Sequence, residues 1–510
     1  MKRTVITFIA FAAAYAAALA QNPCIHHLYT ADPAPVVYEG NDSLYVYVDI
    51  DEGGSFYTMN EWRVYSTCDL VNWTDHGSAL PLASFRWSEP NTAWASQCIR
   101  RGNYYYWYVC CSPKGDWRQG IALARSDKPS GPFKVLSTAQ PMIFLGEGGD
   151  IDPTVFIDDD GQAYLYWGNN KVRYVKLNST MMSYDRSIGK NGVVTVPLTK
   201  EAFGGVKVKD SQGNDVIDGA DAYEEGPWLS KHDGKYYLSY AAGGVPEHLA
   251  YSMSDSPEGP WKYMGQVMRQ QDTGSFTNHG GVIDYKGHSY LLYHTGWLPG
   301  GGGFTRSFAM EEFHYNADGT IPEIKATRKG VAPIATLDPY VRQQAETMNK
   351  GIGIKVTGNE SAGVYVTGIS SSDSIRLRNV DFGSNAPQSV NIRYSCTSAA
   401  GYMVIRLDKV SGRIIAKIKL EPTGGQWAEL QTDLTGTVTG IHDFIFTFIS
   451  TKDSNELKFD WWQFSQEAAS IKAPASGTRT SGSLYNLHGQ PVDTGYKGIV
   501  ISQGRKILMK

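Results

Sequence analysis

The sequence predicts an all-β protein: a five-bladed β-propeller, then a β-sandwich of the jelly-roll type, then a short C-terminal tail. Three observations support this organisation. A strand–turn–strand unit recurs five times in the first two thirds of the chain. A second region has short alternating strands separated by regular turns. A stretch rich in Ala, Ser, Thr and Gly then precedes the last residues and is typical of a linker.

The clearest copy of the recurring unit covers residues 151–168. An acid stands before a proline and an alternating strand, and a turn of Asp and Gly leads into a second strand with aromatic residues at alternate positions. Asp and Gly tolerate the positive φ angles of a tight hairpin. The unit is therefore a β-hairpin.

The second strand of this hairpin recurs at regular intervals. The copies align on Tyr45, Tyr105, Tyr164, Tyr237 and Tyr290, at steps of 60, 59, 73 and 53 residues. Third strands that resemble one another follow three of the five copies. Periods in this range, with several strands in each repeat, are typical of propellers. Five copies predict five blades, within residues 22–335.

A functional residue type precedes each aligned tyrosine by 11 to 13 positions, in the first strand of its blade. These residues are Asp32, Trp94, Asp152, Glu225 and His279. First strands line the channel of a propeller and the blades are related by rotation. We therefore expect three carboxylates, an indole and an imidazole to meet in one cleft.

Length and composition exclude some functions. A chain of 510 residues exceeds one hydrophobic core and predicts several folded units. A net charge of −4 argues against nucleic acid or an anionic membrane as a partner. The 13 tryptophans suit the apolar faces of sugar rings, whereas strand propensity explains most of the 31 tyrosines.

Residues 1–20 read as a secretory signal. Lys2 and Arg3 precede an apolar run that is short for a membrane span, and Ala18 to Ala20 form a small-x-small cleavage site. We expect cleavage near Ala20 and a secreted, periplasmic or cell-surface protein with no membrane span. The spacing of the six cysteines fits neither a zinc site nor a disulfide framework. A single disulfide bond remains an open alternative.

The predicted ring suits hydrolysis of a glycosidic bond. The reaction needs a proton donor for the leaving oxygen and, with inversion, a carboxylate that activates water across roughly 6.5–9.5 Å. Acids on separate blades supply such a wide gap. A third carboxylate near the donor would raise the donor's pKa and hold its orientation.

The acid motifs resemble glycoside hydrolase family 43. The resemblance rests on residues 30–35, 151–161 and 223–228 and covers about 310 residues. It implies a five-bladed inverting enzyme in which Asp32 is the general base, Glu225 the general acid, and Asp152 tunes the acid's pKa and orients it. Glu224 is the rival for Glu225. We prefer Glu225 because it directly precedes Gly-Pro, and adjacent strand residues face opposite ways.

The same resemblance implies three further site residues. Trp94 would form an apolar wall for the sugar, with a core tryptophan as the alternative. Arg306, after a glycine run, would bind a substrate hydroxyl or hold Asp152, with a surface arginine as the alternative. His279 matches an axial histidine that contacts calcium through water, although a hydrogen-bonded histidine without metal is nearly as well supported.

Residues 340–466 resemble carbohydrate-binding module family 6, on the segments 343–346, 425–427 and 459–464. The resemblance implies that Glu346 and Asp460 help to hold a structural calcium ion and that Trp427 stacks on a sugar. Residues 371–378 lack the second aromatic of the usual loop site. Weak sugar binding and a purely bracing role both stay open.

The tail, 467–510, combines a linker with a segment that resembles C-terminal sorting segments of exported Bacteroidetes proteins. Its length predicts a small strand pair, and its processing would imply an extracellular or surface destination.

These features predict an enzyme that releases α-L-arabinofuranosyl groups from arabinoxylan, the choice favoured by residues 59–74 and by the appended module. A β-xylosidase acting on xylo-oligosaccharides is the alternative, since the acids do not separate two pentosides, and an endo-arabinanase is third. A non-catalytic surface glycan-binding protein is the alternative of another class. We expect no cofactor for the chemistry, a plant cell-wall polysaccharide or oligosaccharide as partner, and a monomer.

Overall fold

The computed structural model describes residues 21–359, 363–397, 401–449, 457–469, 484–486, 491–493, 496–502 and 505–509. The predicted signal segment and most of the predicted linker lie outside the described residues. The described part is almost entirely β, as predicted. Its short helices are η1 (Leu82–Ser84) and α2 (Lys200–Phe203), and it contains no helix long and apolar enough to cross a membrane.

Five antiparallel sheets follow one another between residues 30 and 313, and we call them blades 1 to 5. Blade 1 contains β1 (Thr30–Val37), β2 (Leu44–Ile50), β3 (Glu61–Thr67) and β4 (Trp73–Pro81). Blade 2 contains β5 (Trp94–Arg101), β6 (Tyr104–Cys111), β7 (Gly120–Ser126) and β8 (Lys134–Val135). Blade 3 contains β9 (Thr154–Ile157), β10 (Ala163–Trp167), β11 (Val172–Leu177) and β12 (Val194–Val196).

Blade 4 follows a hairpin of β13 (Gly205–Lys209) and β14 (Asp215–Gly219). It contains β15 (Tyr223–His232), β16 (Lys235–Ala242), β17 (His248–Ser254) and β18 (Lys262–Met268). Blade 5 has three strands, β19 (Gly281–Tyr285), β20 (His288–Thr295) and β21 (Ser307–Phe313).

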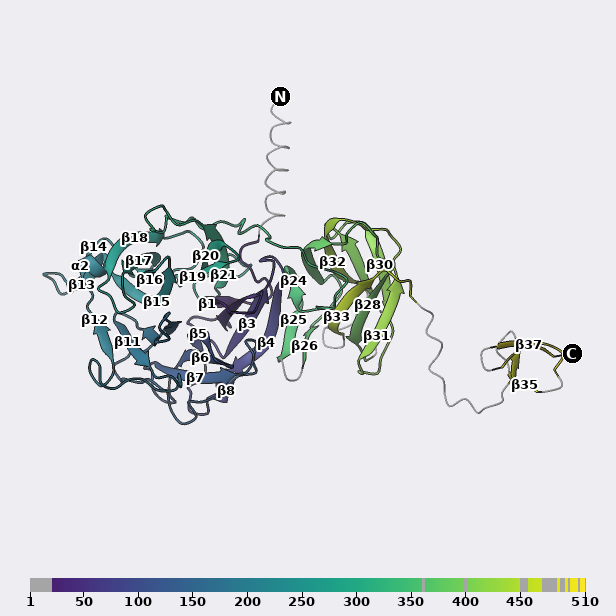
Figure 1. The fold of residues 1–510 in the computed structure, drawn as a ribbon, viewed down its shortest axis with the longest axis horizontal. Helices are drawn as coiled ribbons and strands as arrows, with labels where there is room; N and C mark the ends of the chain where they lie inside the picture. Colours follow the sequence, from purple (N-terminus) through teal and green to yellow (C-terminus); the bar gives the residue numbers. More distant parts are fainter. Residues whose placement is uncertain are drawn as a thin grey trace, which may run out of the picture. The chain divides into compact units, whose positions relative to one another are not determined.

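The first strands of the blades form a closed circle. β1 contacts β5, β5 contacts β9, β9 contacts β15, β15 contacts β19, and β19 contacts β1 again. In Figure 1 the labelled β1, β5, β15 and β19 lie near the centre of this region, and β4, β8, β12 and β18 lie toward its edge. The five-bladed propeller predicted from the tyrosine spacing is therefore confirmed.

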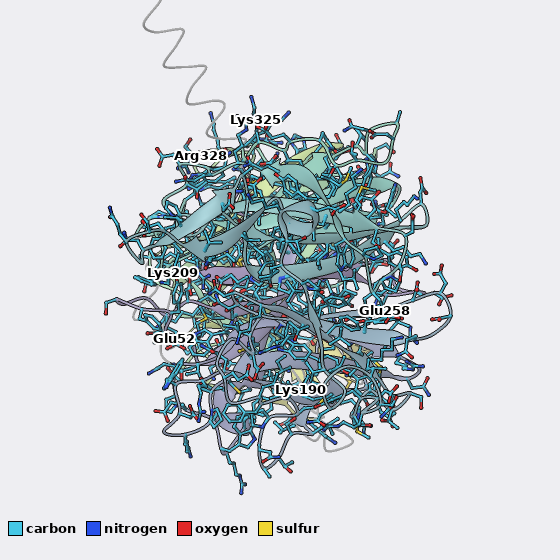
Figure 2. All side chains as sticks on the ribbon, turned by 90° about the vertical axis from the view of Figure 1, so that its left-hand side faces the viewer. Glu52, Lys190, Lys209, Glu258, Lys325 and Arg328 are labelled. Atoms are coloured by element: carbon cyan, nitrogen blue, oxygen red, sulfur yellow. The ribbon has the colours of Figure 1, made fainter. Side chains whose placement is uncertain are left out.

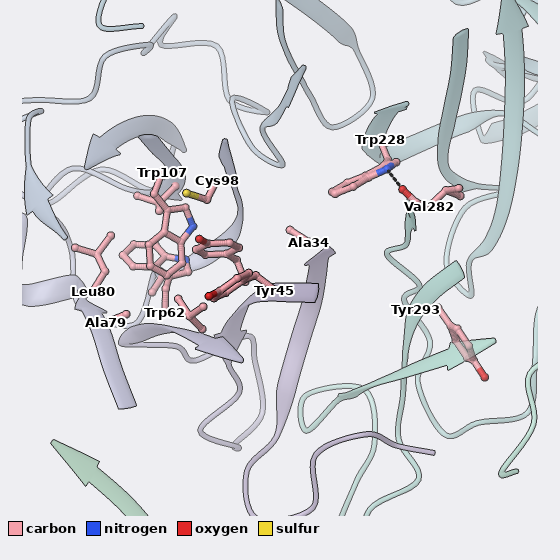
Figure 3. Packing of buried hydrophobic residues seen from close by; sticks show 14 of the residues in the cluster. Ala34, Tyr45, Trp62, Ala79, Leu80, Cys98, Trp107, Trp228, Val282 and Tyr293 are labelled. Carbon is pink, nitrogen blue, oxygen red and sulfur yellow. Dashed lines mark hydrogen bonds between the residues drawn. The ribbon is translucent and has the colours of Figure 1, made fainter. Parts of the chain in front are cut away.

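Large side chains from successive blades fill the space between the sheets. Trp62 and Trp107 are fully buried, and Trp228 donates a hydrogen bond from Nε1 to the Val282 carbonyl at 3.0 Å (Figure 3). Burial of each such aromatic side chain contributes about 1.5–3 kcal/mol. Exposed charged side chains such as Lys190 and Lys325 lie at the surface (Figure 2).

The second region is a sandwich of two antiparallel sheets. One has the order β25-β26-β33-β28-β31, with β22 beside β33, and the other has the order β24-β27-β32-β29-β30. The first sheet uses β22 (Gln343–Gln344), β25 (Lys355–Asn359), β26 (Gly363–Thr367), β28 (Ser389–Ser395), β31 (Ala428–Asp433) and β33 (Lys458–Ser465). The second uses β24 (Lys350–Ile352), β27 (Ser374–Asp381), β29 (Gly401–Leu407), β30 (Ile414–Leu420) and β32 (Ile441–Ile449).

The sandwich is joined to blade 1 by backbone pairing. β23 (Thr347–Met348) adds to the outer edge of β4, which makes blade 1 five-stranded. Asn72 donates to the Arg378 carbonyl at 2.8 Å and accepts from the Arg378 N–H at 2.9 Å. Residues up to Glu467 form one compact unit and residues 468–510 a second.

The second unit is larger than the predicted strand pair. Its described residues form one sheet of four short strands in the order β35-β34-β36-β37. These are β34 (Leu484–Asn486), β35 (Pro491–Val492), β36 (Gly498–Ser502) and β37 (Arg505–Met509). All six cysteines lie in the first unit, and no disulfide bond joins any of them in the described structure.

Candidate active site

The structure brings the five residues of the predicted ring into one cleft. Asp32, Trp94, Asp152, Glu225 and His279 all line a cavity of about 910 Å³. Each lies at the start of the first strand of its blade or two residues before that strand. Rotation of the blades about one axis therefore gathers residues from distant parts of the sequence.

Local backbone irregularities turn the acids toward the cleft. Asp32 and Asp152 have positive φ angles of 47° and 60°, a region that few residues other than glycine adopt. The pairing register shifts around Asp32 in β1 and on both sides of Glu225 in β15. Such bulges re-aim side chains and concentrate beside functional sites.

Asp32 contacts two cationic side chains, Arg306 and His279, and the neutral ring of His294. Arg306 donates from Nη1 to Asp32 Oδ1 at 3.2 Å, and His279 Nδ1 lies 3.4 Å from the same oxygen. Burial alone would raise the pKa of Asp32, but Arg306 and hydrogen bonds from His279 and His294 outweigh it and hold that pKa well below its usual range. Asp32 is therefore an ionised carboxylate.

The two histidines beside Asp32 differ in charge. Burial would lower the pKa of His279, but the hydrogen bond to Asp32 and the charges of Asp152, Asp32 and Glu225 outweigh it and raise that pKa to about 9. Burial lowers the pKa of His294, which is fully buried. His294 Nε2 lies 2.9 Å from the Thr277 carbonyl oxygen, and His294 Nδ1 lies 3.2 Å from Asp32 Oδ1 and 3.4 Å from the Asp32 backbone nitrogen.

Asp152 and Glu225 are a pair of electrostatically coupled carboxyl groups. The Gly226 N–H donates to Asp152 Oδ2 at 2.9 Å, and Asn169 donates to Glu225 Oε2 at 2.6 Å. Burial, reinforced by the charge of Glu225, raises the pKa of Asp152 to about 7, and burial with the charge of Asp32 also raises the pKa of Glu225. This pair therefore keeps a proton under conditions in which Asp32 has none.

Gly226 is needed at this point of β15. Its φ is +61°, and a Cβ there would lie 3.0 Å from Cδ2 of His279. A side chain would therefore strain the backbone and displace the imidazole.

Glu224 also reaches the cleft wall, but with a different partner. The Lys207 ammonium, from the β13–β14 hairpin, lies 2.6 Å from its carboxylate. Glu225 instead accepts a hydrogen bond from the neutral amide of Asn169 and is electrostatically coupled to Asp152, which suits a group that holds a proton.

Arg306 and Trp94 are placed as cleft residues. Arg306 binds Asp51 through two hydrogen bonds, Nε to Oδ2 at 2.9 Å and Nη2 to Oδ1 at 3.0 Å, and it stacks over the Tyr57 ring at 5.1 Å. Its acid partner is Asp32 rather than Asp152, which was one of the two roles expected from the sequence; the other, binding of a substrate hydroxyl, stays a prediction. Trp94 is half-buried and donates from Nε1 to the Tyr57 carbonyl at 3.1 Å.

Several supporting residues were missed by the sequence reasoning. Asp51 and Asn169 follow the second strands of blades 1 and 3, and His294 lies near the end of the second strand of blade 5. In a hairpin, the end of the second strand is beside the start of the first. Extending the blade alignment to that end of each hairpin would have found all three.

Two further buried carboxyl groups lie next to the acids. Among the described side chains, both oxygens of Asp49 and Oε1 of Glu247 are buried without a hydrogen-bond partner. Burial, followed by the charge of Asp32 or Glu225 respectively, raises the pKa of each well above its usual range. Burial therefore favours the protonated form of both groups, and no sequence pattern marked them.

The predicted residues of the sandwich lie on β33 and in neighbouring loops. Trp427 is 38 % exposed and meets the Tyr365 ring edge-on at 5.4 Å. The Asp460 carboxylate is bound by Arg393, and Glu346 is buried. The described ranges hold no group of three or more His, Cys, Asp or Glu side chains arranged around a metal position. The calcium ions expected here and near His279 stay predictions.

The cleft therefore combines the ionised Asp32 carboxylate, the Asp152–Glu225 carboxyl pair, which retains a proton, and the two cations Arg306 and His279. Such a set can activate water on one side of a bound molecule and donate a proton on the other.

Comparisons with known proteins agree with this chemistry. The family model described as "Glycosyl hydrolases family 43" matches residues 20–321, and "Carbohydrate binding module (family 6)" matches residues 344–466. An arabinoxylan arabinofuranohydrolase of Bacillus subtilis is 30% identical and aligns with 87% of this chain and 92% of its own. Another from Paenibacillus polymyxa is 26% identical over 92% of this chain and 79% of its own.

A solved structure extends the similarity to three dimensions. The family 43 arabinoxylan arabinofuranohydrolase from Bacillus subtilis, in complex with cellotetraose, superposes with a TM-score of 0.73 at 28% identity. The match covers 88% of this chain and 98% of that one. The likeness therefore includes both the propeller and the sandwich.

Proposed function

The chain belongs to glycoside hydrolase family 43, and we propose that it is an exported inverting enzyme that removes α-L-arabinofuranosyl groups from arabinoxylan. One observation carries the proposal: carboxyl groups from three different blades line one cleft with opposite protonation states. Relatives named for this activity align along both the propeller and the sandwich.

Asp32 is proposed as the general base. Arg306 and the two histidines keep it ionised, so it can accept a proton from a water molecule throughout the working pH range. Arg306 is itself fixed by Asp51, so the guanidinium orients Asp32 and leaves it little freedom to rotate.

Glu225 is proposed as the general acid. Its raised pKa keeps a proton available for the leaving oxygen of the glycosidic bond. Asp152 lies beside it through the Gly226 N–H and would hold the pKa of Glu225 up by charge repulsion and share its proton. The His279 imidazolium offsets the combined negative charge of the three acids.

Two tryptophans support the proposed substrate, and the N-terminal segment supports the proposed export. Trp94 would line the sugar pocket, and Trp427 would give the sandwich a platform for polysaccharide. Residues 1–20 would direct export and be removed near Ala20.

Product analysis tests the proposal. Protein comprising residues 21–510 is incubated with arabinoxylan, xylo-oligosaccharides and linear arabinan, and the released sugars are separated by chromatography. We expect arabinose from arabinoxylan as the main product. Xylose from xylo-oligosaccharides would favour the β-xylosidase alternative, and binding without release would favour a non-catalytic protein.

A further inference from the structure

A chain of hydrogen bonds leads from the β13–β14 hairpin to the Glu225 carboxyl group. The Lys207 ammonium, on β13, donates to Asn170 Oδ1. Asn170 donates from Nδ2 to Asn169 Oδ1 at 2.6 Å, and Asn169 donates from Nδ2 to Glu225 Oε2, also at 2.6 Å. We call Lys207, Asn170 and Asn169 the amide relay. It connects an element outside the five blades to the proposed general acid.

The lysine at the far end fixes the direction of every hydrogen bond in the amide relay. An ammonium group has three donors and no acceptor, whereas a side-chain amide has a donor end and an acceptor end. Asn170 must therefore turn its carbonyl oxygen toward Lys207 and its NH2 group toward Asn169. Asn169 in turn accepts through its own oxygen and presents its NH2 group to Glu225.

The direction of the amide relay decides which oxygen of Glu225 carries the proton. A protonated carboxyl group has a single O–H donor. Because Oε2 accepts the N–H of Asn169, the proton occupies Oε1 and is available to a leaving oxygen. If the amides were reversed, Glu225 would donate its proton to the oxygen of Asn169, and that proton would be engaged before the reaction.

The backbone around the two asparagines is held on both sides. The Asn169 N–H donates to the Gly149 carbonyl at 3.3 Å, in the loop before β9, and the Asn170 N–H donates to the Glu224 carbonyl on β15 at 2.7 Å. A Cβ on Gly149 would lie 2.9 Å from the Asn169 carbonyl oxygen, so the two segments are in close contact. The amide relay is therefore preorganised beside Glu225, and its side-chain amides are the groups left to be oriented.

We propose that Lys207 is a positioning residue that acts through Asn170 and Asn169 to keep the proton of Glu225 on Oε1. The inference rests on the proposed function and adds a residue that lies in none of the acid motifs. Lys207 also lies 2.6 Å from the Glu224 carboxylate, so an experiment must separate the amide relay from the charge of Glu224.

The test uses substrates that differ in their need for a proton. Kinetics are measured on arabinoxylan and on aryl α-L-arabinofuranosides whose phenol leaving groups differ in acidity, because acid catalysis matters most for poor leaving groups. We expect Lys207→Met to lower kcat about tenfold on arabinoxylan and on the least acidic phenol, and less than about twofold on the most acidic phenol, with little change in KM.

Two further variants test the direction of the hydrogen bonds. Asn170→Asp keeps the size of the side chain and the contact with Lys207, but a carboxylate has no donor for Asn169. Asn169 should then turn its NH2 group away from Glu225, and the variant should show the same selective loss as Lys207→Met. Lys207→Arg keeps a cation that only donates and should retain most of the activity on every substrate.

Two controls address the hairpin and Glu224. Lys200→Met breaks the exposed Lys200–Asp218 ion pair of the same region and should leave every activity unchanged. Glu224→Gln combined with Lys207→Met removes the carboxylate that the single variant leaves without its lysine, and the selective loss on poor leaving groups should persist. Recovery in this double variant would assign the effect to the charge of Glu224 and overturn the proposal.

Three other results would also overturn the proposal: equal losses of Lys207→Met on all leaving groups, an Asn170→Asp variant with the wild-type dependence on the leaving group, or a Lys207→Arg variant as impaired as Lys207→Met. A wild-type protein inactive on every substrate would instead refute the proposed function.

Discussion

Asp32 and Glu225 are buried carboxyl groups in the same cleft, yet their neighbours move their pKa values in opposite directions. Asp32 meets the Arg306 guanidinium, whereas Glu225 accepts a hydrogen bond from the Asn169 amide and lies in the field of the Asp32 and Glu224 charges. Desolvation raises the pKa of any buried acid, and at Asp32 the bound cation together with the hydrogen bonds to the carboxylate reverses the shift. The individual contacts of Asp32 and Glu225 therefore decide which carboxyl group acts as the base and which as the acid.

Glu225→Gln tests the acid at the residue scale. Gln keeps the size and the contact with Asn169 but has no proton to donate, so kcat on arabinoxylan should fall by about 10²–10⁴-fold. Aryl arabinofuranosides with good leaving groups should lose much less. Glu224→Gln is the matched control and should cost less than Glu225→Gln. Undiminished turnover by Glu225→Gln would remove Glu225 from the acid role.

Asp152→Asn tests the coupling of the carboxyl pair. The two groups are coupled, since the charge of Glu225 raises the pKa of Asp152, so removal of the Asp152 carboxyl group should let Glu225 give up its proton at lower pH. The basic limb of the kcat/KM profile should therefore move down by about one pH unit, while the acidic limb, set by Asp32, should stay in place. A basic limb that stays fixed or moves up would contradict this coupling.

At the scale of elements, blade 1 joins the sandwich through a buried ionic centre. The Asp75 carboxylate on β4 is fully buried and contacts His27, Arg63 and the Tyr65 hydroxyl. Arg63 also donates to the Val356 carbonyl of the sandwich at 3.4 Å. Burial would raise the pKa of Asp75, but the charge of Arg63 and the His27 hydrogen bond outweigh it and hold that pKa below its usual range.

Asp75→Ala leaves the Arg63 guanidinium buried without its main partner and should lower the free energy of unfolding by about 3–5 kcal/mol. Urea denaturation at neutral pH measures the loss. Because the folded-state pKa of Asp75 is depressed, its contribution is present above the unfolded pKa and disappears as pH falls through the folded value. Glu61→Gln removes a partly exposed partner of Arg63 and should cost at most about 1 kcal/mol. Equal effects of the two variants would contradict this account.

The repeated hairpins could be predicted from the sequence because each blade is a local structure with its own aromatic and turn pattern. The ring of acids followed, since rotation places equivalent residues together. The supporting contacts could not be predicted in the same way. Arg306 meets Asp51 across 255 positions of sequence and His294 meets Asp32 across 262, and neither pair has a spacing rule. Arg306 was accordingly expected either to bind a substrate hydroxyl or to hold Asp152, and its contact with Asp32 was not predicted.

At the scale of the whole molecule, the propeller and sandwich share a sheet, whereas residues 468–510 form a separate unit. Unfolding of residues 21–467 should be a single calorimetric transition, and removal of residues 468–510 should leave its Tm and kcat unchanged. A chain ending at residue 335 would expose the β4 edge and lose the contacts of Arg63 and Asn72, so its Tm should fall. Two well-separated transitions for residues 21–467 would show that the sandwich folds independently.

In the proposed reaction, carboxyl groups on three blades act across one axial cleft, and water attacks opposite the leaving oxygen. Proton NMR during the first minutes of arabinoxylan hydrolysis distinguishes inversion from retention, because the anomeric signal of the released sugar appears before mutarotation. We expect β-L-arabinofuranose to form first and the α anomer later, by inversion. Initial release of the α anomer would mean retention through a covalent intermediate, and the roles assigned to Asp32 and Glu225 would be contradicted.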